Sequence, residues 1–146
     1  MDLLTEIPTS PPPAQKRTRV FAALVDFVIL ISGCYLIASL SGQTYHQDGT
    51  IGFNLTGVPA LMALLLAVLL LPISEGLTGQ TIGKRLFKIQ VVRNDFTKVN
   101  LGSSIVRHLF DPVDCFLLVG LIIASSNPKK QRIGDLVAKT YVVLKG

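Results

Sequence analysis

An arginine and an aspartate in the first apolar stretch are the residues of this chain best suited to chemistry. Arg19 opens the stretch, and Asp26 lies seven positions further on, within it. On an α-helix this spacing returns to nearly the same face, two turns away. An ionised carboxylate inside a membrane is costly, so Asp26 is a candidate for binding an ion or exchanging a proton, although a role in helix packing explains it equally well. The partner of Asp26 is either Arg19, a residue on another helix or a bridging water. Arg19 in turn pairs either with Asp26 or with a lipid phosphate.

Further charged side chains lie beside the later apolar segments. Glu75 follows the second segment and is either a carboxylate that lines a site or a solvated helix end. Arg107 and Asp114 repeat the seven-residue spacing of Arg19 and Asp26 ahead of an apolar run. We attribute this echo to chance, because the residues in between differ and no longer repeat is visible.

Catalytic and metal-binding patterns are lacking in the sequence. His108 lies near Asp111, and we interpret the pair as part of a polar helix turn at a membrane surface rather than as a metal site. Gly79 and Gly83 precede Lys84, but their spacing does not fit a phosphate-binding loop. No Ser/His/Asp or Cys/His grouping is present, so we expect no enzyme, no cofactor and no metal.

Two apolar helices are predicted to hold these groups, over residues 19–41 and 56–75. The apolar residues 20–40 extend about 31 Å as a helix, the thickness of a bilayer's hydrocarbon core. Residues 58–73 extend only about 24 Å, so the second helix must include flanking residues to cross a membrane. Pro72 predicts a kink near the end of the second helix. The first stretch is too long for an ordinary signal peptide and contains an aspartate, so we interpret it as an uncleaved anchor.

The third apolar segment, residues 101–125, is too interrupted to cross a membrane. Its uninterrupted part spans only about 15 Å, and charged residues break its first half. We therefore predict a broken, re-entrant helix, which keeps the basic tail on the same side as the N-terminus. Strands over 86–93 and 136–145 are predicted to pair on that side. The expected fold is an all-α membrane protein with two transmembrane helices, a third re-entrant helix and a short cytoplasmic β-hairpin-like element.

Composition and charge agree with a membrane protein. The 146 residues are 49% hydrophobic and only 16% charged, with a mean hydropathy of +0.53. The net charge of +5 comes from basic residues grouped beside the apolar segments, which indicates the positive-inside bias and contact with lipid rather than nucleic acid. Residues 1–18 are predicted to form a disordered cytoplasmic tail, and residues 41–57, without Lys or Arg, to lie outside. We expect a bacterial cytoplasmic membrane protein with both termini in the cytoplasm.

Three motifs resemble the RDD family of small membrane proteins, which is named for an arginine and two aspartates. They are RVFAALVDFVI from Arg19, EGLTGQTIGKRLFKIQVVR from Glu75, and QRIGDLVAKTYVV from Gln131. The resemblance implies an RDD membrane domain over residues 19–146, with Arg19 as the family arginine and with Asp26 and Asp135 as the aspartates. One departure lies at residues 94–96, where the family has a turn that ends in glycine. Phenylalanine disfavours positive φ, so Phe96 predicts another or a longer turn.

The resemblance implies two kinds of function. Transport of unidentified ligands has been suggested for the family, some relatives are described as cation/proton antiporters, and one eukaryotic relative is an assembly factor in a membrane complex. We expect either a transporter of cations, protons or a small ligand that acts as an oligomer, or a non-catalytic module that assembles or stabilises other membrane proteins or binds anionic lipid. In the module, residues 19–26, 81–85 and 132–135 form a structural polar network. The residues expected to bind an ion or proton, or to build this network, are Arg19, Asp26, Glu75, Arg107, Asp114, Arg132 and Asp135.

Overall fold

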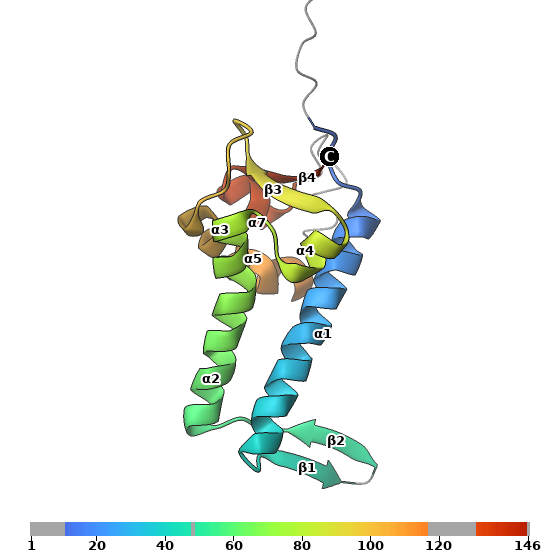
Figure 1. The fold of residues 1–146 in the computed structure, drawn as a ribbon, viewed down its shortest axis with the longest axis vertical. Coiled ribbons are helices and arrows are strands. Elements are labelled where there is room, and N and C mark those ends of the chain that lie inside the picture. Colours follow the sequence, from blue (N-terminus) through green and yellow to red (C-terminus); the bar gives the residue numbers. More distant parts are fainter. Residues whose placement is uncertain (1–10, 48, 117–130, 146) are drawn as a thin grey trace, which may run out of the picture.

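The computed structural model describes residues 11–47, 49–116 and 131–145, and two long helices dominate it (Figure 1). The first is α1 (Lys16–Leu40), and the second runs without interruption through α2 (Gly57–Val68), η1 (Leu69–Ile73) and α3 (Ser74–Thr78). Both are long and apolar enough to cross a membrane, with a mean hydropathy of 2.4 in their most apolar windows. The prediction of a mostly helical chain with two apolar spans is confirmed.

Five of the remaining elements gather at one end of the two helices, in a compact region that we call the head (Figure 1). It contains α4 (Ile82–Leu86), β3 (Ile89–Arg93), α5 (Leu101–Phe116), α7 (Ile133–Val137) and β4 (Thr140–Leu144). Strands β3 and β4 pair antiparallel, which confirms the predicted pairing, but both strands start three or four residues later than predicted because short helices precede them. Pro12 accepts a backbone hydrogen bond from Leu144, so the residues before α1 and the end of β4 lie side by side in the head.

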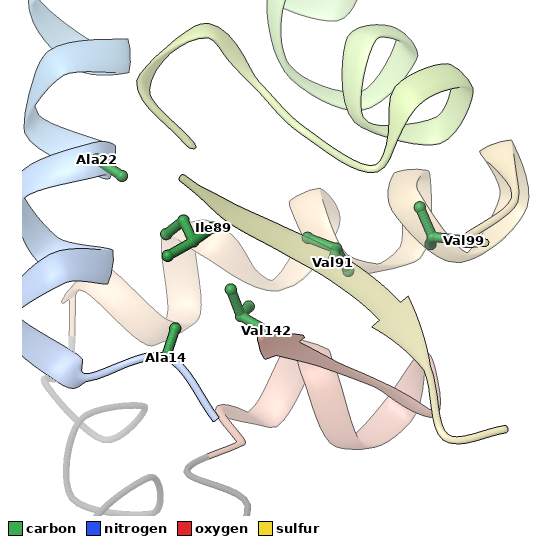
Figure 2. Close-up of a cluster of buried hydrophobic side chains, with 6 residues drawn as sticks. All are labelled: Ala14, Ala22, Ile89, Val91, Val99 and Val142. Carbon is green, nitrogen blue, oxygen red and sulfur yellow. The ribbon is translucent and has the colours of Figure 1, made fainter. Parts of the chain in front are cut away.

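A small apolar core holds the head on the first turns of α1 (Figure 2). Alternate residues of a strand face the same side, so Ile89 and Val91 of β3 both point into this core. The core cluster consists of Ala14, Ala22, Ile89, Val91, Val99 and Val142. The rest of α1 and α2 keeps large apolar side chains exposed, such as Phe27 at 60% and Leu65 at 61%, as helices that face lipid do.

A second strand pair at the far end of the helices was not predicted. Strands β1 (Thr44–Gln47) and β2 (Thr50–Phe53) form a hairpin within the polar stretch that follows α1, at the end opposite the head (Figure 1). Gly49, at φ +77°, supplies the left-handed conformation that a tight hairpin turn needs. With four residues in each strand and few apolar side chains, the hairpin gives only a weak pattern in the sequence.

Two predictions about helix breaks need correction. Pro72 lacks the N–H that an α-helical turn uses, and it lies in η1, a wide π-helical turn from which the helix continues to Thr78 rather than ending at residue 75. The break predicted among the polar residues of the third segment is wrong over α5, which is one helix from Leu101 to Phe116. Ser104, Arg107, His108 and Asp111 of this helix have partners inside the head. The predicted return lies outside the described residues, as do residues 1–10 of the predicted disordered tail. Residues 11–18 of that tail are ordered, because they bond to β4 and begin α1.

The turn after β3 also differs from the prediction. Phe96 does adopt a left-handed conformation, with φ 62°, and the strand pair forms without disturbance. The Asp95 carboxylate accepts hydrogen bonds from the backbone N–H of Thr97 at 3.1 Å and from its hydroxyl at 2.6 Å. The Phe96 ring packs edge-on against Tyr141, with centroids 5.7 Å apart. These contacts stabilise a backbone conformation that phenylalanine alone disfavours.

The head is built from two copies of one unit, so the statement that no longer repeat exists is wrong. Residues 80–92 and 131–143 share a glutamine, an isoleucine, a glycine, a lysine and two valines at matching positions. Each copy is a five-residue helix followed by a strand. Val91 lies opposite Val142, its own equivalent, so a local two-fold axis through the strand pair relates the copies.

Local geometry agrees between the copies. Gln80 donates its side-chain amide to the carbonyl of Ile89 at 2.8 Å, and Gln131 does the same to Thr140 at 2.7 Å. Lys88 and Lys139, just before the strands, have φ of 52° and 53°. Each short helix packs on a long one, α4 on α1 and α7 on α5. The two units thus present equivalent positions, which allow one half to be compared with the other.

Candidate functional site

A buried carboxylate, Glu75, lies at the centre of a network of ion pairs in the head. The π-helical turn precedes α3, which carries Glu75 into the head, where its side chain is fully buried. Its Oε1 accepts a hydrogen bond from Arg107 Nη1 at 2.8 Å and another from Ser104 Oγ at 3.3 Å. Its Oε2 accepts one from the ammonium of Lys84. One carboxylate is therefore shared by two buried cations.

Arg107 extends the network to a second buried carboxylate, Asp135. Its Nε lies 2.9 Å from Asp135 Oδ1, and Arg19 Nη1 lies 3.3 Å from Asp135 Oδ2. Arg19 also donates to the carbonyl of Val142 at 3.1 Å, and the backbone N–H of Arg132 donates to Asp135 at 3.2 Å. Positive and negative groups thus alternate from α4 through α3, α5 and α7 to α1.

A histidine forms a side branch of this network. His108 Nδ1 lies 2.5 Å from Asp111 Oδ2, and its Nε2 lies 3.8 Å from Glu75 Oε2. Arg132 Nη2 lies 3.8 Å from the other oxygen of Asp111. Glutamate, aspartate, histidine, lysine and arginine side chains therefore meet where the second long helix ends. Within the part of the chain that the structure describes, no group of three or more His, Cys, Asp or Glu side chains is arranged to hold a metal.

Asp26 stands apart from this network and joins α1 to α4. Its carboxylate accepts hydrogen bonds from the Thr81 hydroxyl at 2.5 Å and from the Gly83 N–H at 2.7 Å. These groups start the short helix α4, whose free N–H groups favour a negative charge. Arg19 points instead to Asp135, so of the partners left open for Asp26, another segment of the chain is the one observed.

Five of the predicted site residues come together, and one described residue, Asp26, lies apart from them. Arg19, Glu75, Arg107, Arg132 and Asp135 lie in the network; Asp26 lies at the joint with α4, and the side chain of Asp114 is outside the described part. Ser104, His108 and Asp111 take part although none was predicted as a site residue, and Lys84 was predicted only as part of the segment 81–85 of the structural network. The repeat could have identified Lys84. It occupies the same position in the first copy as the predicted site residue Asp135 in the second.

Electrostatics favour the charged states of Asp135 and Arg107 but not that of Lys84. Burial opposes ionisation of Asp135, but Arg107, Arg132 and Arg19 outweigh it and hold the pKa of Asp135 below its ordinary value. Burial lowers the pKa of Lys84 despite the attraction of Glu75. For Arg107, the carboxylates of Glu75 and Asp135 outweigh burial and raise its pKa.

The lowered pKa of Asp135 predicts how stability depends on pH. A carboxyl group with a folded-state pKa below its unfolded value stabilises the fold above the unfolded pKa, about 3.9 for aspartate. The stabilisation is lost as the pH falls through the folded-state pKa. We expect the difference in unfolding free energy between wild type and Asp135→Asn to be full at pH 6 to 7 and to shrink steadily below about pH 4.

Chemical denaturation of the detergent-solubilised protein across this pH range measures that difference. Asp95→Asn is the control, because Asp95 is exposed and bonds only to Thr97 among the described residues. Its substitution should change the unfolding free energy far less. A difference for Asp135→Asn that stays constant into acid would show that Asp135 is not stabilised as a carboxylate.

Fold and site together define a small helical domain of the membrane type, with two candidate spans and a buried ion-pair network at one end. The model of the RDD family matches residues 13–139, and the chain belongs to this family. The resemblance seen in the sequence is thereby confirmed. No curated protein and no solved structure matches the chain.

Proposed function

We propose that this RDD protein is a non-catalytic membrane module that assembles with copies of itself or with other membrane proteins. The main support for the proposal is that the charged residues of the motifs bond to other residues of the same chain. Asp26 bonds to the start of α4, and Arg19 pairs with Asp135. These contacts lie within the head, and each carboxylate oxygen of Asp26 already accepts a hydrogen bond from α4 or its N-cap, which favours a structural role for Asp26 over ion binding.

The orientation that we propose places the head in the cytoplasm of a bacterial cell. The basic residues flanking α1 and α4 lie at the head end of the helices, and residues 41–57 at the opposite end contain no Lys or Arg. This distribution fits the positive-inside bias. Leu101 begins α5 beside Gly76, and Gln131 is bonded to Thr140 in the head. The segment between them thus starts and ends at one side, which supports a re-entrant course.

A second candidate function, cation or proton transport by an oligomer, is favoured by one observation. Glu75, which follows a π-helical turn, lies in a series of titratable side chains with His108 and Asp111 of α5. Such turns occur frequently at functional sites. Two spans and one short helix cannot enclose a polar path, so this candidate requires other copies or a partner to complete it.

Two substitutions of Asp26 separate a structural role from ion binding. Asp26→Asn keeps an acceptor for the Gly83 N–H and can donate to the Thr81 hydroxyl, so a small loss of stability is expected. Asp26→Leu leaves both groups without their acceptor and should cost about 2 to 4 kcal/mol. Thermal unfolding in detergent, with and without Na⁺, K⁺ or Li⁺, measures both effects.

The control is Thr81→Val, which removes one of the two bonds. Combined with Asp26→Leu, Thr81→Val should add only the loss of the N-cap bond that the Thr81 hydroxyl accepts from the Lys84 N–H, about 1 kcal/mol, because both changes break the contact between Thr81 and Asp26. The proposal fails if wild type is stabilised by a cation and both Asp26 variants lose this stabilisation equally. The module is supported if each variant loses stability in proportion to the number of hydrogen bonds that it breaks, and if no cation changes the stability of the wild type.

A further inference from the structure

A basic pocket lies in the head beside the end of the second long helix. Its volume is about 620 Å³, and it is lined by Thr78, Gln80, Arg85, Lys88 and Lys145. Three short segments form it: the loop after α3, the region around the end of α4, and the residue that follows β4. None of its basic residues belongs to the buried ion-pair network.

Hydrogen bonds hold the walls of this pocket in place. Buried Gln80 donates to the carbonyl of Ile89 at 2.8 Å, which leaves its side-chain oxygen as an acceptor. The ammonium of Lys145 reaches that oxygen at 3.4 Å, and the backbone N–H of Lys145 donates to the carbonyl of Lys88 at 2.8 Å. Two lysines from distant parts of the sequence are thus fixed side by side.

The charge of the pocket is unbalanced. Its lining residues include three cations and no carboxylate. Among the described residues, neither Arg85 nor Lys88 forms an ion pair. Adjacent cations repel one another, so this arrangement favours a bound anion, and guanidinium and ammonium donors suit phosphate oxygens well.

The internal repeat provides a comparison within the same molecule. The equivalents of Gln80 and Lys88 are Gln131 and Lys139, and Asn94 takes the place of Lys145. The Asn94 N–H donates to the carbonyl of Lys139 at 3.0 Å, and Gln131 donates to the Asn94 side chain at 3.4 Å.

Arg85 in turn corresponds to Leu136. The same backbone and glutamine contacts therefore form in the second copy with a leucine and an asparagine where this pocket has an arginine and a lysine. The fold does not require these two charges.

Apolar side chains beside the pocket indicate which anion it meets. Thr78 is the last residue of the second candidate span. Leu77 and Leu86 are exposed at 72% and 68%, and Ile82 is exposed one turn before Leu86 on α4. Basic groups next to exposed leucines at the end of a span suit the boundary between lipid headgroups and acyl chains.

We propose that this pocket binds the phosphate group of an anionic phospholipid at the membrane surface. The inference rests on the proposed membrane location of the two long helices. Arg85, Lys88 and Lys145 contact the phosphate, while Leu77, Ile82 and Leu86 lie against the acyl region of the same leaflet. The site gives the head a preference for anionic over zwitterionic lipid that general surface charge does not supply.

The repeat also supplies the test variant. Arg85→Leu combined with Lys145→Asn gives the pocket the residues that the second copy already carries at these positions, so the fold should tolerate both. The matched control is Arg93→Leu with Lys98→Asn, which removes the same charges from exposed positions in the head. The probe is a fluorescent short-chain phosphatidylglycerol, titrated against the full chain in neutral detergent, with phosphatidylcholine for comparison.

Wild type and the control should prefer phosphatidylglycerol, and the pocket variant should bind it about thirtyfold more weakly, the effect of two basic residues near a lipid surface. Inorganic phosphate should not displace the lipid. Equal losses in the two variants, or displacement by inorganic phosphate at similar concentrations, would overturn the inference. Insertion into liposomes is checked separately, because a chain that inserts without lipid preference contradicts only the pocket, whereas one that fails to insert contradicts the membrane module as well.

Discussion

Arg107→Met is expected to destabilise the head by about 3 to 5 kcal/mol, the cost of removing one partner from a buried ion pair. The guanidinium of Arg107 lies between Glu75 and Asp135, at 2.8 and 2.9 Å, with only 3% of the side chain exposed. Methionine fills similar volume but leaves both carboxylates with one cation fewer. Unfolding of the solubilised protein by denaturant, followed by circular dichroism, measures the change.

Arg93→Met is the control, because Arg93 is exposed at the end of β3. It should alter the unfolding free energy by no more than about 0.5 kcal/mol. Combining Arg107→Met with Glu75→Gln should cost less than the sum of the two single changes, since the second removes a charge that the first leaves uncompensated. Wild-type stability in Arg107→Met would mean that the network does not hold the head together.

Gly83→Ala is expected to separate α4 from α1. A Cβ at this glycine would lie 2.1 Å from the carbonyl oxygen of Ala22 and 3.0 Å from its carbonyl carbon. Both atoms are backbone, so the clash is relieved only by moving one helix away from the other, which also breaks the bond from Gly83 to Asp26. We expect a loss of about 3 kcal/mol, at the upper end for overpacking, measured by thermal or denaturant unfolding.

Two other glycines serve as comparisons for Gly83. Gly134 is its equivalent in the second copy, where a Cβ would lie 2.9 Å from the carbonyl oxygen of Arg107, so Gly134→Ala should have a smaller effect of the same kind. Gly102, in the first turn of α5, meets only Asn100 Oδ1 at 3.9 Å. Gly102→Ala should therefore be neutral or stabilise by up to about 1 kcal/mol. Equal effects of Gly83→Ala and Gly102→Ala would contradict the close packing of α4 on α1.

Local patterns in the sequence predicted the elements better than their contacts. The two long helices follow from apolar runs of sufficient length, and the pair β3 and β4 from β-branched residues. The ion pairs join residues far apart in sequence; Arg19 and Asp135 are 116 positions apart. Arg19 and Asp26 share a face of α1, but this did not predict their partners. Arg19 pairs with Asp135 of α7, whereas Asp26 bonds to the start of α4.

The repeat escaped detection because few of its residues recur. The glutamine, glycine and lysine shared by the two copies each have a local structural task, and the positions between them differ even in charge, as Lys84 and Asp135 do. The structure makes the relation plain through the matching hydrogen bonds of Gln80 and Gln131 and the pairing of Val91 with Val142. The network charges differ between the copies, so the two halves complement each other rather than duplicate one site.

In the proposed module, the charges of the RDD motifs hold the head together rather than carry an ion. The most direct test is proton movement in liposomes that contain the purified protein and an internal pH dye, after addition of Na⁺, Li⁺ or K⁺. We expect no cation-dependent movement for wild type in a preparation shown to be folded and inserted, and the same result for Asp26→Asn. Cation-dependent movement in wild type that Asp26→Asn abolishes, in a variant of unchanged stability, would contradict the claim.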